Sequence, residues 1–342
     1  MTIAVDAMGG DFAPAVVVEG ALDALAESPG RFAVTLVGRQ EQVEQELARF
    51  PRRVEQFRTE GRVSVYHASE VIEMHDLPNA ALKTKRDSSI SVGLGLHHDG
   101  KAQAFVSAGN TGAVLSASTL ILGRIAGIGR PTIGALIPTA GSPCLLLDAG
   151  TNVDCRPRHL YEFGVMGSSY ISAMLGKARP SVGLLSIGEE DTKGNETGLQ
   201  AFALLKQSGL NFVGNVEGRD ILKGTTDVVV CDGFVGNILL KFGESVPAFF
   251  KAKFIRYASQ GLLNKLVALV ARKGMRSVMK ELDYQEHGGV PLLGINGVSI
   301  IGHGGSTPKA IKNMILRAEE MVKRRVNARI QESLQGSSHG GE

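Results

Sequence analysis

The chain has 342 residues, of which 43% are hydrophobic and 21% charged, a composition typical of soluble globular proteins. Its three cysteines are odd in number and show no CxxC spacing, which indicates reduced thiols rather than a disulfide framework. The start of the chain lacks the pattern of a secretory signal, and no run approaches the roughly 18–20 apolar residues that span a bilayer. We therefore expect a cytoplasmic protein that meets a membrane only at its surface.

Positive charge is concentrated in two segments, although the formal net charge is only +3. Residues 248–281 hold eight Lys or Arg and one Glu, and residues 309–330 hold seven Lys or Arg and two Glu. Such localised charge indicates an anionic partner. Nucleic acid is disfavoured as that partner because aromatic residues make up only 5% of the chain, tryptophan is absent and no nucleic-acid-binding module is present.

Predicted strands and helices alternate over most of the chain. Short apolar runs bounded by glycine are typical of strands buried on both faces of a parallel sheet. The predicted strands are 2–6, 33–37, 63–67, 103–107, 132–138, 144–149, 181–186, 211–215 and 226–231, with two more beside Gly297. The predicted helices are 14–27, one between 37 and 63, 88–99, 111–123, 158–176 and 196–208. The segments 132–138 and 144–149 are close enough in sequence to form adjacent antiparallel strands.

The C-terminal part is predicted to form a long helix that begins at Thr307 after a Ser306 cap. The Gly/Ser-rich tail 335–342 is predicted to be disordered. No internal repeat or flexible linker divides the rest. We therefore predict a single, two-lobed α/β catalytic body with three layers over residues 1–334.

Residues 245–283 interrupt the alternation and are predicted to form two or three helices separated at Gly261 and Gly274. At 100° per residue, the apolar side chains of the second helix fall within an arc of about 160°. They are Leu262, Leu263, Leu266, Val267, Leu269 and Val270. One interpretation is a helix packed on the core or on a dimer partner. The other, favoured by the basic charge around it, is a helix that lies on an anionic membrane surface.

Six predicted strands end in loops of small and polar residues. In open α/β sheets, ligands bind outside the carboxyl ends of the strands, where backbone N–H groups and helix N-termini favour anions. The loops lie within the segments 2–11, 104–113, 145–152, 183–196, 228–237 and 299–306. The pattern predicts an enzyme that holds an anionic substrate.

The loops differ in how strongly they indicate chemistry. MGGD (8–11) is a weak signal, and it lacks the GxGxxG pattern of dinucleotide sites. SAGNTG (107–112) offers side-chain donors beside a helix start, which suits a phosphate or a thioester oxygen but also suits plain helix capping. DGFVGN (232–237) followed by Lys241 resembles another anion loop, and GHGGS (302–306) presents His303.

The segment EEDTKGNE (189–196) gathers several carboxylates around Lys193. Packed carboxylates favour a metal, whereas the lysine among them favours a neutralising ion pair. No GxSxG elbow, HExxH motif or P-loop is present. Direct attack by a bound substrate is therefore favoured over a covalent enzyme intermediate, and no cofactor and no metal are expected.

Taken together in this order, the loops resemble the bacterial phosphate acyltransferase family of phospholipid synthesis, also called acyl-acyl-carrier-protein:phosphate transacylase. The resemblance covers roughly residues 1–330. It rests on VDAMGGD, KRDSSISVGLGLHHDGKAQAFVSAGNTGA, LLDAGTN, SIGEEDTKGNE, DVVVCDGFVGN, KFGES and HGGVPLLGINGVSIIGHGGS.

The resemblance implies transfer of a long-chain acyl group from acyl carrier protein to inorganic phosphate. The acyl phosphate formed serves glycerol-3-phosphate acyltransferase. It also implies a three-layer α/β/α body like the isocitrate/isopropylmalate dehydrogenase fold, a homodimer and peripheral association with an anionic membrane surface.

On this basis we expect two sets of site residues. Those expected to act in catalysis are Asn110, Lys193, Asn237, Lys241 and His303. Those expected to bind substrate are Asp6, Gly9, Gly10, Asp11, Ser107, Gly109, Thr111, Asp148, Asn152, Asp232, Gly304 and Ser306. The insert residues expected to bind the membrane are Leu262, Leu263, Leu266, Leu269 and Val270.

Other functions stay open at this point. They are a short-chain acyl-CoA phosphotransacylase, a dehydrogenase of the related fold, and a non-catalytic scaffold at the membrane. The group that protonates the leaving thiolate does not follow from the sequence.

Overall fold

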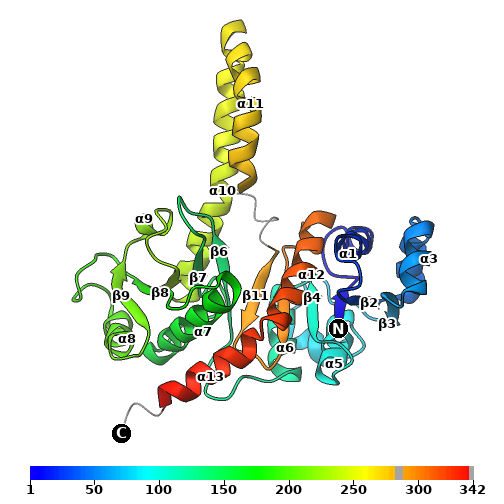
Figure 1. The fold of residues 1–342 in the computed structure, drawn as a ribbon, viewed down its shortest axis with the longest axis horizontal. Helices are drawn as coiled ribbons and strands as arrows, with labels where there is room; N and C mark the ends of the chain where they lie inside the picture. Colours follow the sequence, from blue (N-terminus) through cyan, green and yellow to red (C-terminus); the bar gives the residue numbers. More distant parts are fainter. Residues whose placement is uncertain (282–287, 339–342) are drawn as a thin grey trace.

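Two β-sheets form the cores of two lobes in the computed structural model, which describes residues 1–281 and 288–338 (Figure 1). The first sheet has the order β3-β2-β1-β4-β12-β11-β5, and the second β6-β7-β10-β8-β9. The strands of the first are β1 (Thr2–Asp6), β2 (Ala33–Gly38), β3 (Val63–His67), β4 (Ala104–Ser107), β5 (Thr132–Ile133), β11 (Val290–Leu293) and β12 (Val298–Ile301). Those of the second are β6 (Ala135–Ile137), β7 (Cys144–Leu147), β8 (Ser181–Leu185), β9 (Asn211–Val216) and β10 (Val228–Val230).

The central strands of both sheets are parallel and buried, as their uninterrupted apolar sequences predict. Antiparallel strands occur at one side of each sheet: β11 pairs antiparallel with β12 and β5, and β6 with β7. The parallel strands of each sheet direct their carboxyl ends to the same edge of that sheet. The loops singled out from the sequence therefore lie at the carboxyl edges of the two sheets.

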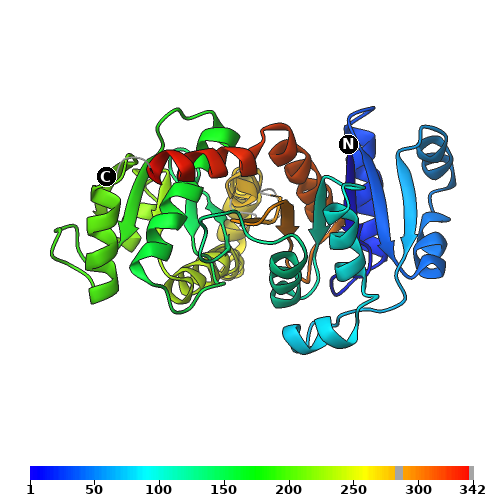
Figure 2. The same ribbon diagram turned by 90° about the horizontal axis from the view of Figure 1, so that it is seen from below.

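Helices cover both faces of each sheet. In the first lobe α1 packs on α12, and α5 packs on α6 and β1. In the second lobe α7 packs on α8, β10 and α13, and Figure 2 shows α13 reaching from α12 across to this lobe. The helices are α1 (Ala15–Glu27), α2 (Gln40–Leu47), α3 (Pro51–Thr59), α4 (Pro78–Thr84), α5 (Ser89–His98), α6 (Thr111–Ile121), α7 (Pro157–Leu175), α8 (Glu196–Lys206), α9 (Gly218–Ile221), α10 (Gly233–Ala258), α11 (Leu262–Glu281), α12 (Pro308–Lys323) and α13 (Val326–Ser338).

The segment predicted as one strand at 132–138 is divided between the lobes. Thr132 and Ile133 pair with β11 in the first sheet, whereas residues 135–137 pair antiparallel with β7 in the second. The antiparallel pairing with 144–149 is thus confirmed for β6, and the chain crosses from one lobe to the other at Gly134.

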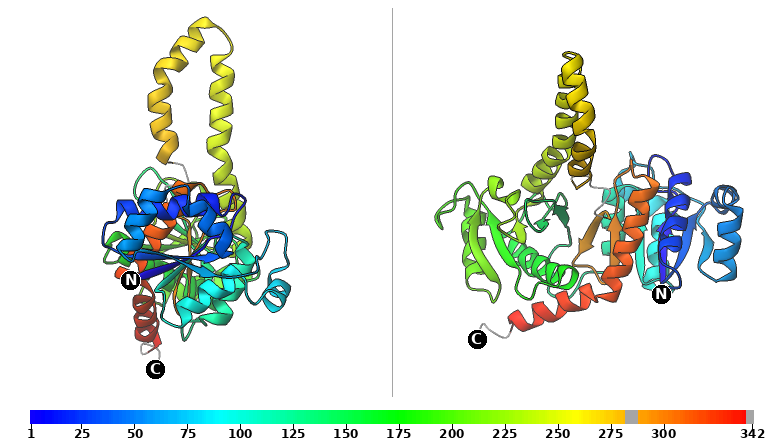
Figure 3. Two further views of the ribbon diagram at one scale, coloured as in Figure 1. Left: turned by 90° about the vertical axis from the view of Figure 1, so that its right-hand side faces the viewer. Right: turned by 45° about the horizontal axis from the view of Figure 1, so that its top comes forward.

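The helical insert is a long antiparallel hairpin that stands away from the body (Figure 3). The predicted break at Gly261 is confirmed, but the predicted break at Gly274 is wrong, because α11 continues through it. A glycine inside a helix costs only about 1 kcal/mol relative to alanine, and good helix formers flank this one. The first helix already begins at Gly233 rather than near 245, and residues 282–283 of the predicted insert lie outside the described residues.

The C-terminal prediction also needs correction. The helix after Thr307 ends at Lys323, and Arg325 has a left-handed φ of 54° before α13 begins. Residues 335–338, predicted as disordered, belong to α13, whose Val326, Ile330 and Leu334 are buried in the core shared with α7. That spacing of four keeps one apolar face against α7. Residues 339–342 lie outside the described residues.

Among the described residues, none of the helices is both long and apolar enough to cross a membrane.

Candidate active site

The first lobe contributes a buried carboxylate at the carboxyl end of β1. The Ser107 hydroxyl, at the end of β4, donates to Oδ2 of Asp6 at 2.6 Å, and the Met8 N–H donates to Oδ1 at 3.1 Å. Ser107 Oγ also accepts the N–H of Gly109 at 3.0 Å. Burial raises the pKa of the Asp6 carboxyl, and the hydrogen bond from Ser107 opposes that shift. Asp6, Ser107 and Gly109 therefore form one unit that joins the loops after β1 and β4.

The loop after β12 lies against the loop after β1. The Asp11 N–H donates to the carbonyl of Gly304 at 2.8 Å. Gly10 has a φ of 108°, and a Cβ on it would lie 3.0 Å from that same carbonyl. A Cβ on Gly9 would lie 2.5 Å from the Asp6 carboxylate. This close approach of three loops requires glycine at both positions.

His303 and Ser306 shape the turn that leads into α12. The Gly305 N–H donates to Nδ1 of His303 at 3.1 Å, and the buried Ser306 hydroxyl donates to the His303 carbonyl at 2.6 Å. A neutral imidazole with this bond carries its proton on Nε2. The ring is exposed, and Thr307 rather than Ser306 caps α12. The predicted Ser306 cap is therefore shifted by one residue.

Both polar atoms of the Asn110 side chain form hydrogen bonds with neighbouring backbone groups. Its Oδ1 accepts the Ala113 N–H at 3.1 Å and so caps α6, and its Nδ2 lies 3.0–3.2 Å from the carbonyls of Glu73, Met74 and Asp76. An amide has only two N–H hydrogens. The geometry therefore makes Asn110 a residue that positions the segment 73–76 beside the helix start, where Thr111 follows.

In the second lobe, Asp148 organises the loop after β7. Its buried carboxylate accepts the N–H groups of Gly150, Thr151 and Asn152 at 2.7–2.9 Å, together with the Thr151 hydroxyl and the Asn152 amide. Asn152 also donates to the carbonyl of Pro131 at 2.8 Å. Asp148 is thus fully occupied with shaping the loop, and Asn152 joins the loop to the segment just before the crossing between the lobes.

The start of α10 packs directly on this loop. Asp232 caps the helix through the Val235 N–H at 2.8 Å, and the Gly233 N–H donates to the Asn152 carbonyl at 2.8 Å. A Cβ on Gly236 would lie only 1.8 Å from the Asp148 carbonyl oxygen. The next residue, Asn237, is exposed and lies beside Gly150. The helix therefore presents the Asn237 amide next to the Asp148 loop.

An apolar contact links the two sets of loops. Ala149, inside the Asp148 loop, donates its N–H to the carbonyl of Ile133 at 3.0 Å. Ala149, Ile133 and Ile301 belong to one buried cluster, against which Leu240 of α10 packs. Ile301 ends β12 just before the His303 loop. This buried cluster therefore joins the start of the Asp148 loop to the end of β12.

The two predicted lysines are exposed. Lys241, with a side chain 54% exposed, pairs with Glu244 at 2.8 Å. Lys193 is exposed in the acidic loop. The ion pairs described for that loop join Glu189 to Arg219 and Asp191 to Lys206. The expected neutralising role of Lys193 is therefore taken by other cations.

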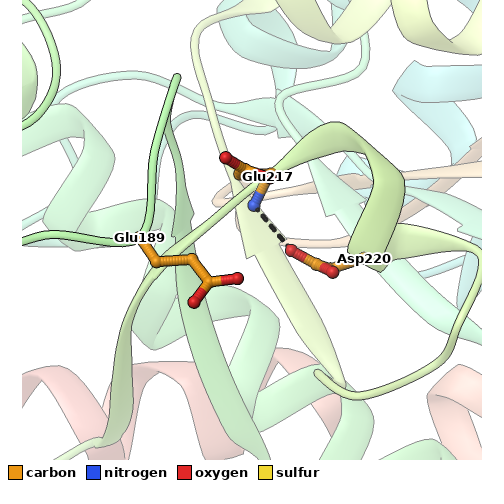
Figure 4. A group of neighbouring side chains, drawn as sticks. All are labelled: Glu189, Glu217 and Asp220. Carbon is orange, nitrogen blue, oxygen red and sulfur yellow. Dashed lines mark hydrogen bonds between the residues drawn. The ribbon is translucent and has the colours of Figure 1, made fainter.

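Figure 4 shows three carboxylates that gather near this loop, Glu189, Glu217 and Asp220, with ligand oxygens within 4.8 Å of one another. Arg219 lies 2.6 Å from the Glu217 carboxylate, and Lys223 pairs with Asp220 at 2.8 Å. Arg219 also lies 3.8 Å from the Glu189 carboxylate, so two cations pair with the three carboxylates in one ion-pair network.

A cleft of about 810 Å³ opens at the carboxyl edge of the second sheet. It lies between the end of β8, the loop 153–155 and the first turns of α8 and α10. Of the predicted site residues, Lys193 and Asp232 line it. The cleft is thus an extension of the candidate site into the second lobe.

The three cysteines are poorly suited to act as nucleophiles. Burial raises the pKa of the Cys155 thiol to about 12, and it does the same to Cys144. Burial also raises the pKa of Cys231 well above its ordinary value. All three are thiols near neutral pH, and the thiolate is the nucleophile.

Three features of the site were missed in the sequence. Gly236 permits the contact between α10 and Asp148, the segment 73–76 is held by Asn110, and Ser186 lines the cleft. Ser186 opens the recognised segment SIGEEDTKGNE, which is the signal that could have found it. The other two depend on contacts between residues far apart in sequence.

Comparison with known proteins identifies the family. The profile of the family described as "Fatty acid synthesis protein" matches residues 1–329. The chain belongs to this family. A phosphate acyltransferase from Pelotomaculum thermopropionicum is 48% identical over 335 residues, covering 98% of this chain and 95% of the relative. Another from Moorella thermoacetica is 48% identical over 322 residues, covering 94% and 92%.

Solved structures share the fold of this family member at low identity. A phosphotransacetylase from Streptococcus pyogenes superposes with a TM-score of 0.63 at 15% identity, covering 94% of each chain. A phosphotransacetylase from Staphylococcus aureus gives 0.59 at 14% identity, again with 94% of each covered. The predicted α/β class is confirmed at this level, as a phosphotransacetylase-like fold.

Proposed function

We propose that this protein transfers a long-chain acyl group from the thioester of acyl carrier protein to inorganic phosphate. The observation that carries the proposal is the 48% identity to phosphate acyltransferases over nearly the whole of both chains. The fold of phosphotransacetylases, shared at 15% identity, agrees with an acyl transfer to phosphate. The glycine-bearing loops at the carboxyl edges of both sheets supply the backbone donors that an anionic substrate needs.

In this reaction a phosphate oxygen attacks the thioester carbonyl, the C–S bond breaks, and the thiolate leaves and takes up a proton. Phosphate needs positioning more than deprotonation, so binding geometry accounts for much of the rate. The Asn237 amide and nearby backbone N–H groups stabilise the oxyanion. Lys193, Lys241 and His303 offset negative charge around the phosphate. Asn110 positions the segment 73–76, and the Asp6 and Asp148 units hold the loops in place.

The direct test incubates the purified protein with phosphate and palmitoyl-acyl carrier protein and traps acyl phosphate with hydroxylamine. Formation of hydroxamate that requires both substrates supports the proposal. Activity with acetyl-CoA in preference to the carrier thioester would favour a short-chain phosphotransacylase. Absence of any acyl phosphate would favour a non-catalytic scaffold.

We further propose that the hairpin of α10 and α11 binds an anionic membrane surface. All five predicted side chains, Leu262, Leu263, Leu266, Leu269 and Val270, are exposed. The hairpin begins at the loop after β10, which is one of the strand-end loops, and it stands away from the body (Figure 3). Basic residues along it attract anionic lipids. The product, an acyl phosphate, would leave near the membrane and serve as the donor for glycerol-3-phosphate acyltransferase in the cytoplasm.

Two further proposals concern architecture. The protein forms a homodimer, for which the exposed apolar faces of the hairpin are one available surface. The fold falls in the isocitrate/isopropylmalate dehydrogenase-like group, in line with a TM-score of 0.50 to a 4-hydroxythreonine-4-phosphate dehydrogenase from Salmonella typhimurium. Chemical cross-linking and analytical ultracentrifugation test the first of these.

A further inference from the structure

A groove of about 910 Å³ runs between α10 and α11, along the hairpin that Figure 3 shows. Its volume lies within the range of sites that enclose small ligands. On α11 the lining extends from Leu262 to Met275, which at a helical rise of about 1.5 Å per residue is a length of about 20 Å. The apolar walls include Phe254, Ile255, Leu262, Leu266 and Leu269. The groove is therefore long and apolar enough to hold a hydrocarbon chain.

The charged residues of the groove all have the same sign. Every described residue that lines it is either apolar or cationic, and the cations are Lys251, Lys265 and Arg272. None of these three side chains forms an ion pair or a hydrogen bond with the described part of the chain. Within residues 248–281 of the sequence, Glu281 is the only carboxylate. Charge complementarity therefore favours an anionic ligand, and the walls favour one that also carries an apolar chain.

The antiparallel arrangement gives the groove two different ends. The turn of the hairpin lies between Ala258, where α10 ends, and Leu262, where α11 begins. Lys251 and Arg272 are both far from this turn along their helices, so they lie toward the body. Ala258 and Leu262 line the end nearest the tip. An anionic head therefore fits the end toward the body, and the chain extends toward the tip.

We infer that this groove binds a single-chain anionic amphiphile, with its head beside Lys251 and Arg272. The acyl phosphate has this chemistry, and naming it as the natural ligand rests on the proposed function. The groove would then hold the product between its release and its use. Leu263 and Val270 are exposed but do not line the groove, so the hairpin keeps a separate apolar surface for the membrane.

The absence of tryptophan from the sequence permits a site-specific test. Phe254→Trp places a single indole in the groove. Phe249→Trp is the matched control, because Phe249 lies exposed on the same helix and does not line the groove. The probe is dodecylphosphonate brominated in mid-chain and kept below its micelle concentration, since bromine quenches an indole that it contacts. We expect saturable quenching in Phe254→Trp and none in Phe249→Trp.

Two pairs of variants, made in the Phe254→Trp protein, test the walls and the charge separately. Leu266→Glu should weaken binding by about tenfold or more. Leu263→Glu, on the same helix but outside the groove, should leave it unchanged. Arg272→Gln should weaken binding of the phosphonate by about fivefold and leave binding of the uncharged dodecyl glucoside, brominated alike, unchanged. Lys273→Gln, which removes a neighbouring cation outside the groove, is the control.

Three results would overturn the inference. Equal quenching in Phe254→Trp and Phe249→Trp, or equal losses in Leu266→Glu and Leu263→Glu, would show unspecific adsorption. Quenching by vesicles of brominated phosphatidylglycerol but not by the monomeric phosphonate would assign the groove to the bilayer. A fall of Leu266→Glu to half the mass of the wild type would assign it to a second copy of the chain.

The same data separate this inference from the proposed reaction. Protein that forms no acyl phosphate but shows quenching confined to Phe254→Trp and lost in Leu266→Glu would keep the groove assignment and refute the reaction. Normal formation of acyl phosphate without such quenching would keep the reaction and refute the groove assignment.

Discussion

Asn110 and Asn237 show how the surroundings of a residue decide its role. Both follow a strand, both stand at the start of a helix, and the sequence predicts the same task for each. The Asn110 amide is already engaged with the carbonyls of the segment 73–76. Asn237 is exposed beside Gly150 and is not the capping residue of its helix, since Asp232 is. Only Asn237 therefore offers an amide to a substrate.

The first prediction concerns Asn237→Ala. Loss of one oxyanion donor typically lowers kcat by about 10²–10³-fold, and we expect a fall of this order with little change in the melting temperature. Asn211→Ala is the control, because Asn211 is also exposed but lies at the amino end of β9. Steady-state assays with palmitoyl-acyl carrier protein measure the effect. A kcat within a factor of about two of wild type would remove Asn237 from the oxyanion site.

The second prediction concerns Asn110→Asp, which keeps the cap oxygen but loses the two N–H donors that face the carbonyls of Glu73, Met74 and Asp76. Unpaired polar groups typically cost about 1–3 kcal/mol when buried, and we expect the free energy of unfolding to fall by this amount. Hydrogen exchange should rise in residues 73–76 while α6 remains protected. Unchanged stability and exchange, with strongly reduced turnover, would return Asn110 to a direct catalytic role.

The third prediction concerns the pH dependence of stability through His97. Its Nδ1 lies 3.0 Å from the Ala102 carbonyl, and its Nε2 accepts the Val298 N–H at 3.0 Å, so the folded state holds the neutral ring. Burial lowers the pKa of His97. The unfolded chain therefore binds a proton near the ordinary value of about 6.5, where the folded state does not. Its stabilising contribution is complete above that value and is lost as the pH falls toward the lower folded pKa.

Denaturant unfolding of wild type and His97→Gln between pH 7.5 and 5 measures this contribution (a range chosen to span about 6.5). The wild type should lose stability more steeply on acidification than the variant. The neighbouring exposed His98, changed to Gln, is the control and should follow the wild type. Parallel curves for wild type and His97→Gln would contradict the prediction.

At the scale of elements, the hairpin of α10 and α11 carries exposed apolar side chains that the two lobes do not cover. Val270 and Leu262 are 85% and 83% exposed. Leu262, Leu266 and Leu269 line the groove toward α10, whereas Leu263 and Val270 do not. The apolar arc predicted from the sequence is therefore divided between the groove and the outer surface of the hairpin.

The fourth prediction uses this division. Leu263→Glu combined with Val270→Glu should abolish flotation with anionic liposomes, since each leucine or valine side chain removed from water contributes roughly 1.5–3 kcal/mol. Wild-type binding should weaken as salt rises, because the attraction of lysines and arginines to anionic lipid is screened. Asn264→Glu, on the same helix, controls for the added charge.

Light scattering of the same variants separates membrane binding from self-association. A double variant that loses flotation and keeps the mass of the wild type agrees with a membrane-facing surface. A double variant that falls to half that mass without lipid would instead make this face a seam between two copies.

Local sequence patterns predicted which segments are strands and which are helices, but they did not predict where each element ends. Apolar runs such as Val228–Val230 and Cys144–Leu147 give buried parallel strands because both faces are covered. The predictions at Gly274 and at residues 335–338 were wrong because a helix tolerates glycine and serine when its other residues stabilise it. The burial of Val326, Ile330 and Leu334 against α7 outweighs the composition of the last turn.

At the scale of the whole molecule, the sequence located the loops of the site but not their internal bonds. The strand-end rule places Asp6, Ser107 and His303 on one edge, because β1, β4 and β12 are parallel neighbours. The approach of Gly236 to Asp148 joins two segments that are 88 positions apart along the chain, and no local sequence pattern predicts that contact. Roles such as that of Asn110 depend on such long-range contacts.

The order of strands in the first sheet has a consequence for how the protein is made. β4 lies between β1 and β12, and α12 packs on α1, so the first lobe contains both the first and nearly the last segments of the chain. During synthesis the N-terminal strands emerge long before their neighbours. The Asp11 N–H meets Gly304 only after some 300 residues have been added. A ribosome must therefore nearly finish the chain before the loop after β1 gains its contact with the loop after β12, and a chain truncated before β11 lacks that contact.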